Sequence, residues 1–149
     1  MTDIVVLDTG VLGRLTHPRP SRELRDWLRA LLDGGRQVRV PEIADYELRR
    51  ELIRAGLSDS VERLEMLEAA IGYLPLTTDA MRTAAEFWAR ARRHGKPMAA
   101  DPALDADVIL AAQAAVLARK GRLVTIATDN VAHLSLFADA RLWNEIVPS

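Results

Sequence analysis

Four acidic residues stand where packing alone gives no reason for a charged side chain. They are Asp8, Glu47, Asp107 and Asp129. The first and last come at the ends of apolar runs, residues 4–7 and 123–127, and the other two belong to segments with helical spacing. Carboxylates that are brought together repel one another, and each shifts toward its neutral form unless a cation lies among them. Oxygen ligands, with no cysteine and no histidines spaced for zinc, suit a hard ion such as Mg²⁺ or Mn²⁺.

A divalent ion held in this way keeps part of its water shell, and one of those waters can become a nucleophile. In phosphodiester hydrolysis the ion orients and activates the water and offsets negative charge on the phosphate and the leaving oxygen. If the four acids converge in the fold, the sequence therefore predicts a site for a divalent ion and its nucleophilic water.

The two apolar runs predict buried strands. A run of Ile, Val and Leu without polar alternation is typical of a parallel sheet that is covered by helices on both faces. In such sheets ligands bind outside the carboxyl ends of the strands, which is where Asp8 and Asp129 would lie. A simpler role for Asp8 is to cap the short helical piece expected at residues 11–15, because Asp is a preferred N-cap residue.

Glu47 lies on a helix predicted for residues 41–55, which begins at a proline and is followed by a glycine. The residue borders the apolar line of this helix, so its charge needs a partner. One candidate is an ion pair with Arg50 or another Arg, of the common but weak kind found within helices. Asp45 and Glu51 are less well placed to point inward.

Asp105 and Asp107 precede an apolar helix that we expect at residues 108–118, after a loop at residues 98–104. Acids in the first turn of a helix are favoured by capping and by the helix dipole. One cap requires only one acid, so the second carboxylate remains available for another role.

Further amphipathic helices are predicted at residues 21–33, 58–71 and 78–93, and further strands at residues 37–40 and 141–147. Helices that alternate with strands in this way indicate a three-layer α/β/α fold around a central, mainly parallel sheet. The length of 149 residues and the hydrophobic fraction of 49% suit one domain, residues 1–149.

The composition excludes several classes of protein. No apolar run reaches the roughly 18 residues of a membrane span, and the amino terminus lacks the pattern of a secretory signal, so we expect a soluble, cytoplasmic protein. The absence of cysteine excludes disulfides, thiolate nucleophiles and cysteine-based zinc sites. A net charge of −1 gives no overall sign of nucleic-acid binding, although a local basic patch remains compatible with it.

Four phrases of the sequence resemble the PIN-domain family, and within it the VapC-like ribonuclease toxins of toxin-antitoxin pairs. They are V-V-L-D-T-G-V-L, A-D-Y-E-L-R-R-E-L, D-A-D-V-I-L-A-A-Q-A and A-T-D-N-V-A-H-L, in this order along nearly the whole chain. The resemblance implies that Asp8, Glu47, Asp107 and Asp129 are the catalytic and metal-binding acids. It further implies a Mg²⁺- or Mn²⁺-dependent endoribonuclease that acts on RNA, is often a homodimer and is often held by a cognate antitoxin.

Asp107 is preferred to Asp105 as the third acid because the family's acid directly precedes the aliphatic phrase. The chain departs from the family at Gly10, where an Asn is common. A polar contact is therefore missing, or is supplied by Thr9, Thr128 or Asn130.

Two groups of basic residues are candidates for contacts with RNA phosphates, although solvated helix faces have the same composition. They are Arg49, Arg50 and Arg54, and Arg90, Arg92, Arg93 and Lys96.

Other functions fit the sequence less well. A haloacid-dehalogenase-type phosphatase requires a second Asp two residues after the first, where this chain has Gly10. A P-loop and the Gly-x-Ser-x-Gly motif of serine hydrolases are both absent. The main alternative is a PIN-like scaffold that binds RNA or a protein without cleavage, but a scaffold has no reason to cluster uncompensated carboxylates.

Overall fold

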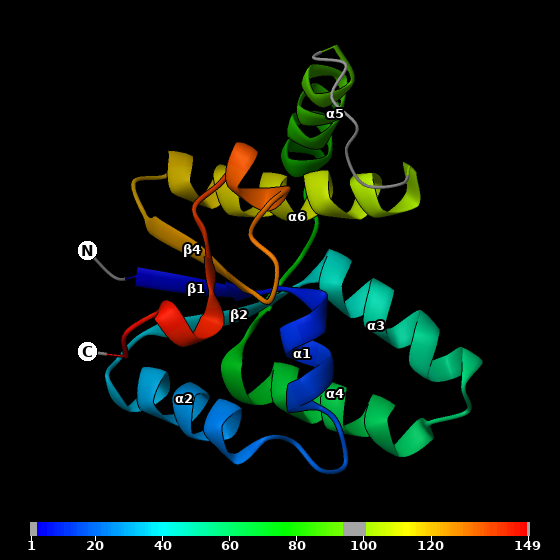
Figure 1. Ribbon diagram of the computed structural model, residues 1–149, viewed down its shortest axis with the longest axis vertical. Coiled ribbons are helices and arrows are strands. Elements are labelled where there is room, and N and C mark those ends of the chain that lie inside the picture. The colour runs from blue at the N-terminus through cyan, green and yellow to red at the C-terminus, as the bar shows by residue number, and fades with distance from the viewer. Residues whose placement is uncertain (1–2, 94–100, 149) are drawn as a thin grey trace.

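The computed structural model describes residues 3–93 and 101–148, and the side chains in these ranges except those of residues 101–103. A five-stranded sheet forms its centre, in the order β3-β2-β1-β4-β5 (Figure 1). The strands are β1 (Asp3–Leu7), β2 (Gln37–Pro41), β3 (Tyr73–Leu74), β4 (Leu123–Thr128) and β5 (Ala140–Leu142). Every neighbouring pair is parallel, which confirms the predicted parallel sheet.

Six α-helices in the described ranges pack around this sheet. They are α1 (Thr9–Leu15), α2 (Arg22–Asp33), α3 (Glu42–Arg54), α4 (Ser58–Ile71), α5 (Thr78–Arg93) and α6 (Asp101–Arg119). Two short 3₁₀ turns, η1 (Leu134–Leu136) and η2 (Trp143–Glu145), follow β4 and β5. Figure 1 shows α5 and α6 on one side of the sheet and α1, α2 and α4 on the other.

The central strand β1 explains why the sheet is covered on both faces. Ile4 and Val6 pack into a core with α5 and α6, whereas Val5 and Leu7 pack into a second core with α1, α2 and α4. Alternate side chains of one strand point to opposite faces, so a strand with two covered faces is apolar throughout. The predicted three-layer α/β/α arrangement is confirmed.

The structure corrects the predicted start of the last helix. Residues 101–104 belong to α6 and not to a loop, while residues 98–100 and the predicted helix end at residues 94–97 lie outside the described residues. Pro102 lies in the first turn of this helix. In the first turn of a helix, a proline lacks only an N–H that has no acceptor within the helix.

The predicted strand at residues 141–147 was too long, because β5 ends at Leu142. Trp143 then turns inward and packs edge to face against Trp27, with 5.5 Å between the ring centroids. The Trp27 Nε1–H donates a hydrogen bond to the Ile146 carbonyl at 3.0 Å. The end of the chain therefore leaves the sheet in order to cover α2.

The described residues contain no helix that combines the length and the apolar character needed to cross a membrane.

We expect Leu7→Ala to lower the free energy of unfolding by about 2–5 kcal/mol, because Leu7 is fully buried directly before Asp8 and its loss leaves a cavity. Leu136→Ala is the control, since Leu136 is 59% exposed and its truncation should change stability by less than about 0.5 kcal/mol. Urea unfolding measures both values. If the two substitutions lower the free energy of unfolding equally, Leu7 is not buried in the core, which would contradict the central position of β1.

Candidate active site

Asp8 lies at the junction of β1 and α1, where two hydrogen bonds hold its carboxylate. Oδ1 accepts from the backbone N–H of Thr9 at 2.7 Å, and Oδ2 accepts from the Thr128 hydroxyl at 2.6 Å. The predicted capping role is confirmed, since Asp8 is the N-cap of α1. Burial raises the pKa of Asp8, the two hydrogen bonds oppose this rise, and the charge of Asp129 adds to it. Asp8 is therefore a fixed, half-buried carboxyl group with a second acid nearby.

Asp129 follows directly on β4, which pairs with β1. Its Oδ1 accepts a hydrogen bond from Nη1 of Arg14 on α1 at 2.9 Å. Its Oδ2 lies beside Gly10, where an added Cβ atom would be 3.4 Å away. Asp129 is thus bound by Arg14 at one oxygen and lies next to Gly10 at the other.

Glu47 approaches the same junction from α3. The Thr9 hydroxyl donates to its Oε1 at 2.7 Å, whereas Nη2 of Arg50 is 4.0 Å from its Oε2. Arg50, the ion-pair partner expected from the sequence, therefore lies only at the outer distance limit of an ion pair. Thr9 is the close partner of Glu47. Thr9 connects the residue that follows Asp8 to the acid of α3.

Asp107 lies in the second turn of α6, so its predicted place at the start of a helix was wrong. Its side chain is half-buried, and none of the residues described donates a hydrogen bond to it. The pKa of Asp107 rises to about 6, mainly because of burial and then because of the charge of Asp8, with a smaller contribution from Glu47. The charge of His133, which precedes η1, acts in the opposite direction.

The neighbouring acid Asp105 has a different environment. It is exposed and lines an apolar hollow between α5 and α6, together with Met81 and Trp88. The charges of Asp8 and Glu47 therefore act on Asp107, while Asp105 faces another part of the surface.

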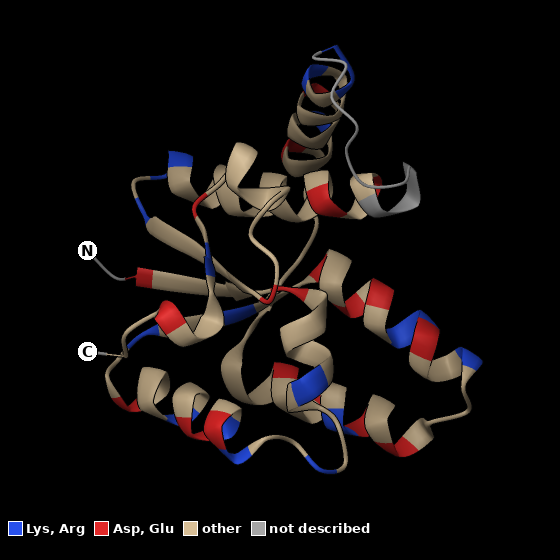
Figure 2. Cartoon of the chain, in the orientation of Figure 1, with Lys and Arg blue, Asp and Glu red and all other residues tan. Residues whose placement is uncertain are grey.

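The acids lie around the carboxyl ends of the strands, and Figure 2 shows acidic positions at the start of α1, along α3 and on α6. In the described part of the chain, no three Asp, Glu or His side chains are close enough as they stand to hold a metal ion. The donor set nevertheless suits Mg²⁺ or Mn²⁺, because it consists of carboxylates that already repel one another. Holding an ion at this site therefore requires rotation of side chains.

Sequence reasoning missed Arg14 and His133 as neighbours of these acids. The Arg14–Asp129 pair joins residues 115 positions apart, which no local pattern reveals. Thr9 and Thr128, in contrast, were predicted as alternative sources of the polar contact expected at Gly10, and both do bind acids of this group.

Asp45 was wrongly judged to be poorly placed for burial, since it is 8% exposed between α3 and α4. Arg49 binds both of its carboxylate oxygens, at 2.9 and 3.0 Å, and also contacts Glu65 at 2.9 Å. Arg49 is therefore a structural residue of the α3–α4 contact and a poor candidate for an RNA contact. Arg54 is paired with Glu51 at 2.7 Å, and Lys96 lies outside the described residues.

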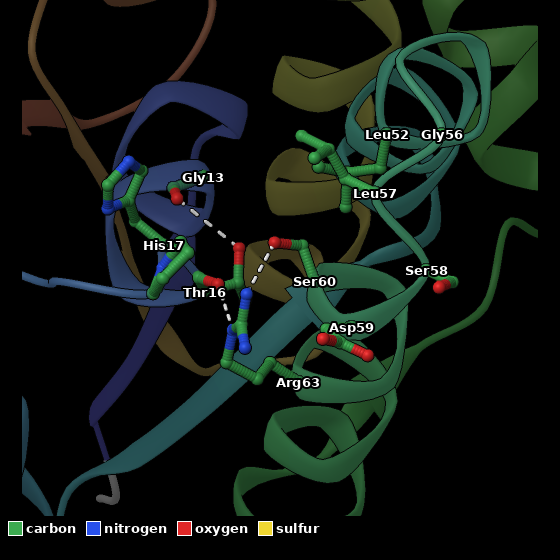
Figure 3. Close-up of a pocket in the computed structure, with 11 residues that line it drawn as sticks. Gly13, Thr16, His17, Leu52, Gly56, Leu57, Ser58, Asp59, Ser60 and Arg63 are labelled. Carbon is green, nitrogen blue, oxygen red and sulfur yellow. Dashed lines mark hydrogen bonds between the residues drawn. The ribbon is translucent and has the colours of Figure 1, made fainter.

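A hollow of about 370 Å³ opens at the other end of α1 (Figure 3). Arg63 crosses it and donates to the Thr16 carbonyl at 2.8 Å and to the Ser60 hydroxyl at 2.7 Å. Its lining includes Asp59 but none of the four candidate acids, so it is separate from the candidate active site.

Comparison with known proteins shows that residues 5–132 match the PIN domain. No curated protein matches the sequence. VapBC2 from Rickettsia felis, solved with promoter DNA, has a similar structure with a TM-score of 0.74 and 15% identity, over 94% of this chain and 98% of that chain. FitAcB from Neisseria gonorrhoeae has a similar structure with a TM-score of 0.65 and 22% identity, over 95% of this chain and 99% of that chain.

A third similar structure is VapBC-5 from Mycobacterium tuberculosis, which belongs to the VapBC family of toxin-antitoxin systems. Its TM-score is 0.54 and its identity is 22%, over 93% of this chain and 96% of that chain. At such identities the three structures establish a common fold and nothing more.

The α3–α4 contact predicts a particular pH dependence of stability. Burial and the adjacent Asp45 carboxylate raise the pKa of Glu68 to about 8, from an ordinary value of 4.5, and its buried Oε2 has no hydrogen-bond partner in the described structure. Between these two pKa values Glu68 is therefore protonated in the folded protein and ionised in the unfolded chain. Stability should fall as the pH rises toward 8 and then level off.

Glu68→Gln should flatten this decline and should leave the variant more stable than the wild type above the raised pKa. Urea unfolding across this pH range measures the effect. Parallel curves for the two proteins would contradict the raised pKa. Exposed Glu62 on the same helix provides the matched control, Glu62→Gln.

Proposed function

The chain belongs to the PIN-domain family, and from this premise we propose that it is a Mg²⁺- or Mn²⁺-dependent endoribonuclease that hydrolyses phosphodiester bonds of RNA. The observation that carries the proposal is the environment of Asp107. Its carboxyl group is half-buried, receives no hydrogen bond from a described residue, and has its pKa raised to about 6 by burial and by the charges of Asp8 and Glu47. Acids in such a group are stabilised when a cation joins them.

Asp8, Glu47, Asp107 and Asp129 would hold the ion or its waters. When bound, the ion would activate a water and offset charge on the phosphate. Asp8 is fixed by the Thr128 hydroxyl and the Thr9 backbone, while Thr9 also orients Glu47 through its own hydroxyl. The two threonines thus set the positions of two acids, and the Asp107 carboxylate is accessible for a ligand.

We further propose that the enzyme is the cytoplasmic toxin of a toxin-antitoxin pair, acts as a homodimer and is held by a cognate antitoxin. The support is the shared fold, because VapBC-5 is a member of the VapBC family of toxin-antitoxin systems and matches over 93% of this chain. The similar structures VapBC2 and FitAcB also carry two-component names, which favours a protein partner for this chain.

The direct test is cleavage of a mixed RNA substrate by the purified protein with Mn²⁺ or Mg²⁺. We expect EDTA to abolish cleavage and Asp107→Asn to reduce it by about 100-fold or more, because a neutral amide is a weaker ligand of a hard cation. Asp105→Asn is the matched control on the same helix and should keep nearly full activity, since Asp105 is exposed on another face.

If the wild type and Asp107→Asn cleave equally, the activity comes from a contaminant or from another site. If no variant cleaves RNA under any metal condition, the non-catalytic scaffold is the better description.

Thermal unfolding with MnCl₂ separates the nuclease from the scaffold without RNA. An ion that binds the folded state stabilises it by about 2.7 kcal/mol at a concentration 100 times its dissociation constant. We expect Mn²⁺ to raise the Tm of the wild type and of Asp105→Asn, and to raise that of Asp8→Asn much less. A Tm that Mn²⁺ leaves unchanged in the wild type would contradict a metal-binding site.

A further inference from the structure

Arg14 connects helix α1 to the acid that follows β4. Its Nη1–H donates to Oδ1 of Asp129 at 2.9 Å. Its guanidinium carbon also lies 5.6 Å from the ring centroid of Trp143, a distance at which cations are attracted to the face of an indole ring. Two contacts from different elements therefore position the charged end of Arg14.

The aromatic partner of Arg14 is itself firmly held. Trp143 is 7% exposed, packs against Trp27, and begins the 3₁₀ turn that follows β5. The guanidinium thus has a fixed surface beside it that does not depend on Asp129. If the carboxylate turns away, Arg14 retains one of its two contacts.

The pair between Arg14 and Asp129 is exchangeable. Their side chains are 44% and 46% exposed, and ion pairs with this much access to water contribute little to stability. On its other side Asp129 faces Gly10, which has no side chain to hold it. The only described cation that binds Asp129 is therefore an arginine that can be displaced.

We propose that Arg14 is a positioning residue that acts as an internal counter-ion of Asp129 and competes with a divalent ion for that carboxylate. This inference rests on the proposed function, since it takes Asp129 as one of the metal-binding acids. Arg14 reduces the repulsion between Asp129 and Asp8 when no ion is bound. For the same reason it lowers the apparent affinity of the site for the ion.

The test is calorimetric titration of MnCl₂ into the full-length chain. Arg14→Gln should bind Mn²⁺ about two- to fivefold more tightly than the wild type, which is the range that removal of an exposed ion pair allows. A merely structural defect would weaken binding, so the direction of the change is diagnostic. Arg14→Lys keeps the positive charge and should return the affinity toward the wild-type value.

Arg141→Gln is the matched control. It breaks another exposed ion pair, with Asp139 at 3.2 Å, in a hollow that Arg141 shares with Asp3 and Leu123 at the starts of β1 and β4, away from the candidate acids. Its Mn²⁺ affinity should equal that of the wild type. In an Asp129→Asn background, Arg14→Gln should produce no gain in affinity, because the acid through which Arg14 acts is neutral.

Equal or weaker Mn²⁺ binding by Arg14→Gln would overturn the inference, and so would an equal gain in the Asp129→Asn background. The result is independent of RNA cleavage. A gain in Mn²⁺ affinity without any RNA cleavage would support the role of Arg14 and reject the nuclease. RNA cleavage with unchanged Mn²⁺ affinity would support the nuclease and reject the role of Arg14. Absence of Mn²⁺ binding in every variant would reject both.

Discussion

Partial burial of the Asp8 carboxyl group at the carboxyl end of the central strand is the constraint on which the candidate site depends. The apolar side chains of β1 are covered on both faces, so the strand has one position in the sheet and delivers Asp8 to one point. A buried carboxylate is costly unless it receives hydrogen bonds. Thr128 from β4 and the first N–H of α1 supply them, and in doing so they fix the side chain between two elements.

The remaining acids show three ways in which a protein tolerates carboxylates that repel one another. Glu47 receives a hydroxyl hydrogen bond from Thr9, and Asp129 is neutralised by Arg14. Among the described residues Asp107 has neither kind of partner, and its pKa rises to about 6. These solutions differ from the Asp45–Arg49 pair between α3 and α4, where a bidentate arginine makes the charge part of the packing. The acids around the carboxyl ends of the strands are therefore the ones whose negative charge a bound cation can still offset.

Much of the fold followed from local sequence patterns. The apolar runs before Asp8 and Asp129 predicted two parallel strands that do pair, and the helical spacing predicted the helices on both faces. The predicted start of α6 was wrong, because a proline such as Pro102 is tolerated in the first turn of a helix. The predicted length of β5 was wrong, because Trp143 packs on Trp27. The contacts of Arg14 and the burial of Asp45 were not predictable, since each depends on elements that come together only in the fold. The identity of the four site residues stays a prediction.

Anomalous diffraction from crystals grown with MnCl₂ tests most directly whether these acids form one metal site. We expect a manganese peak between β1, β4, α3 and α6, beside the carboxylates of Asp8 and Asp107, with Glu47 and Asp129 bound directly or through water. We also expect Arg14 to be displaced from Asp129 where that carboxylate binds the ion directly. A crystal with manganese elsewhere, or with no ordered manganese while the four carboxylates keep their present partners, would contradict a shared metal site.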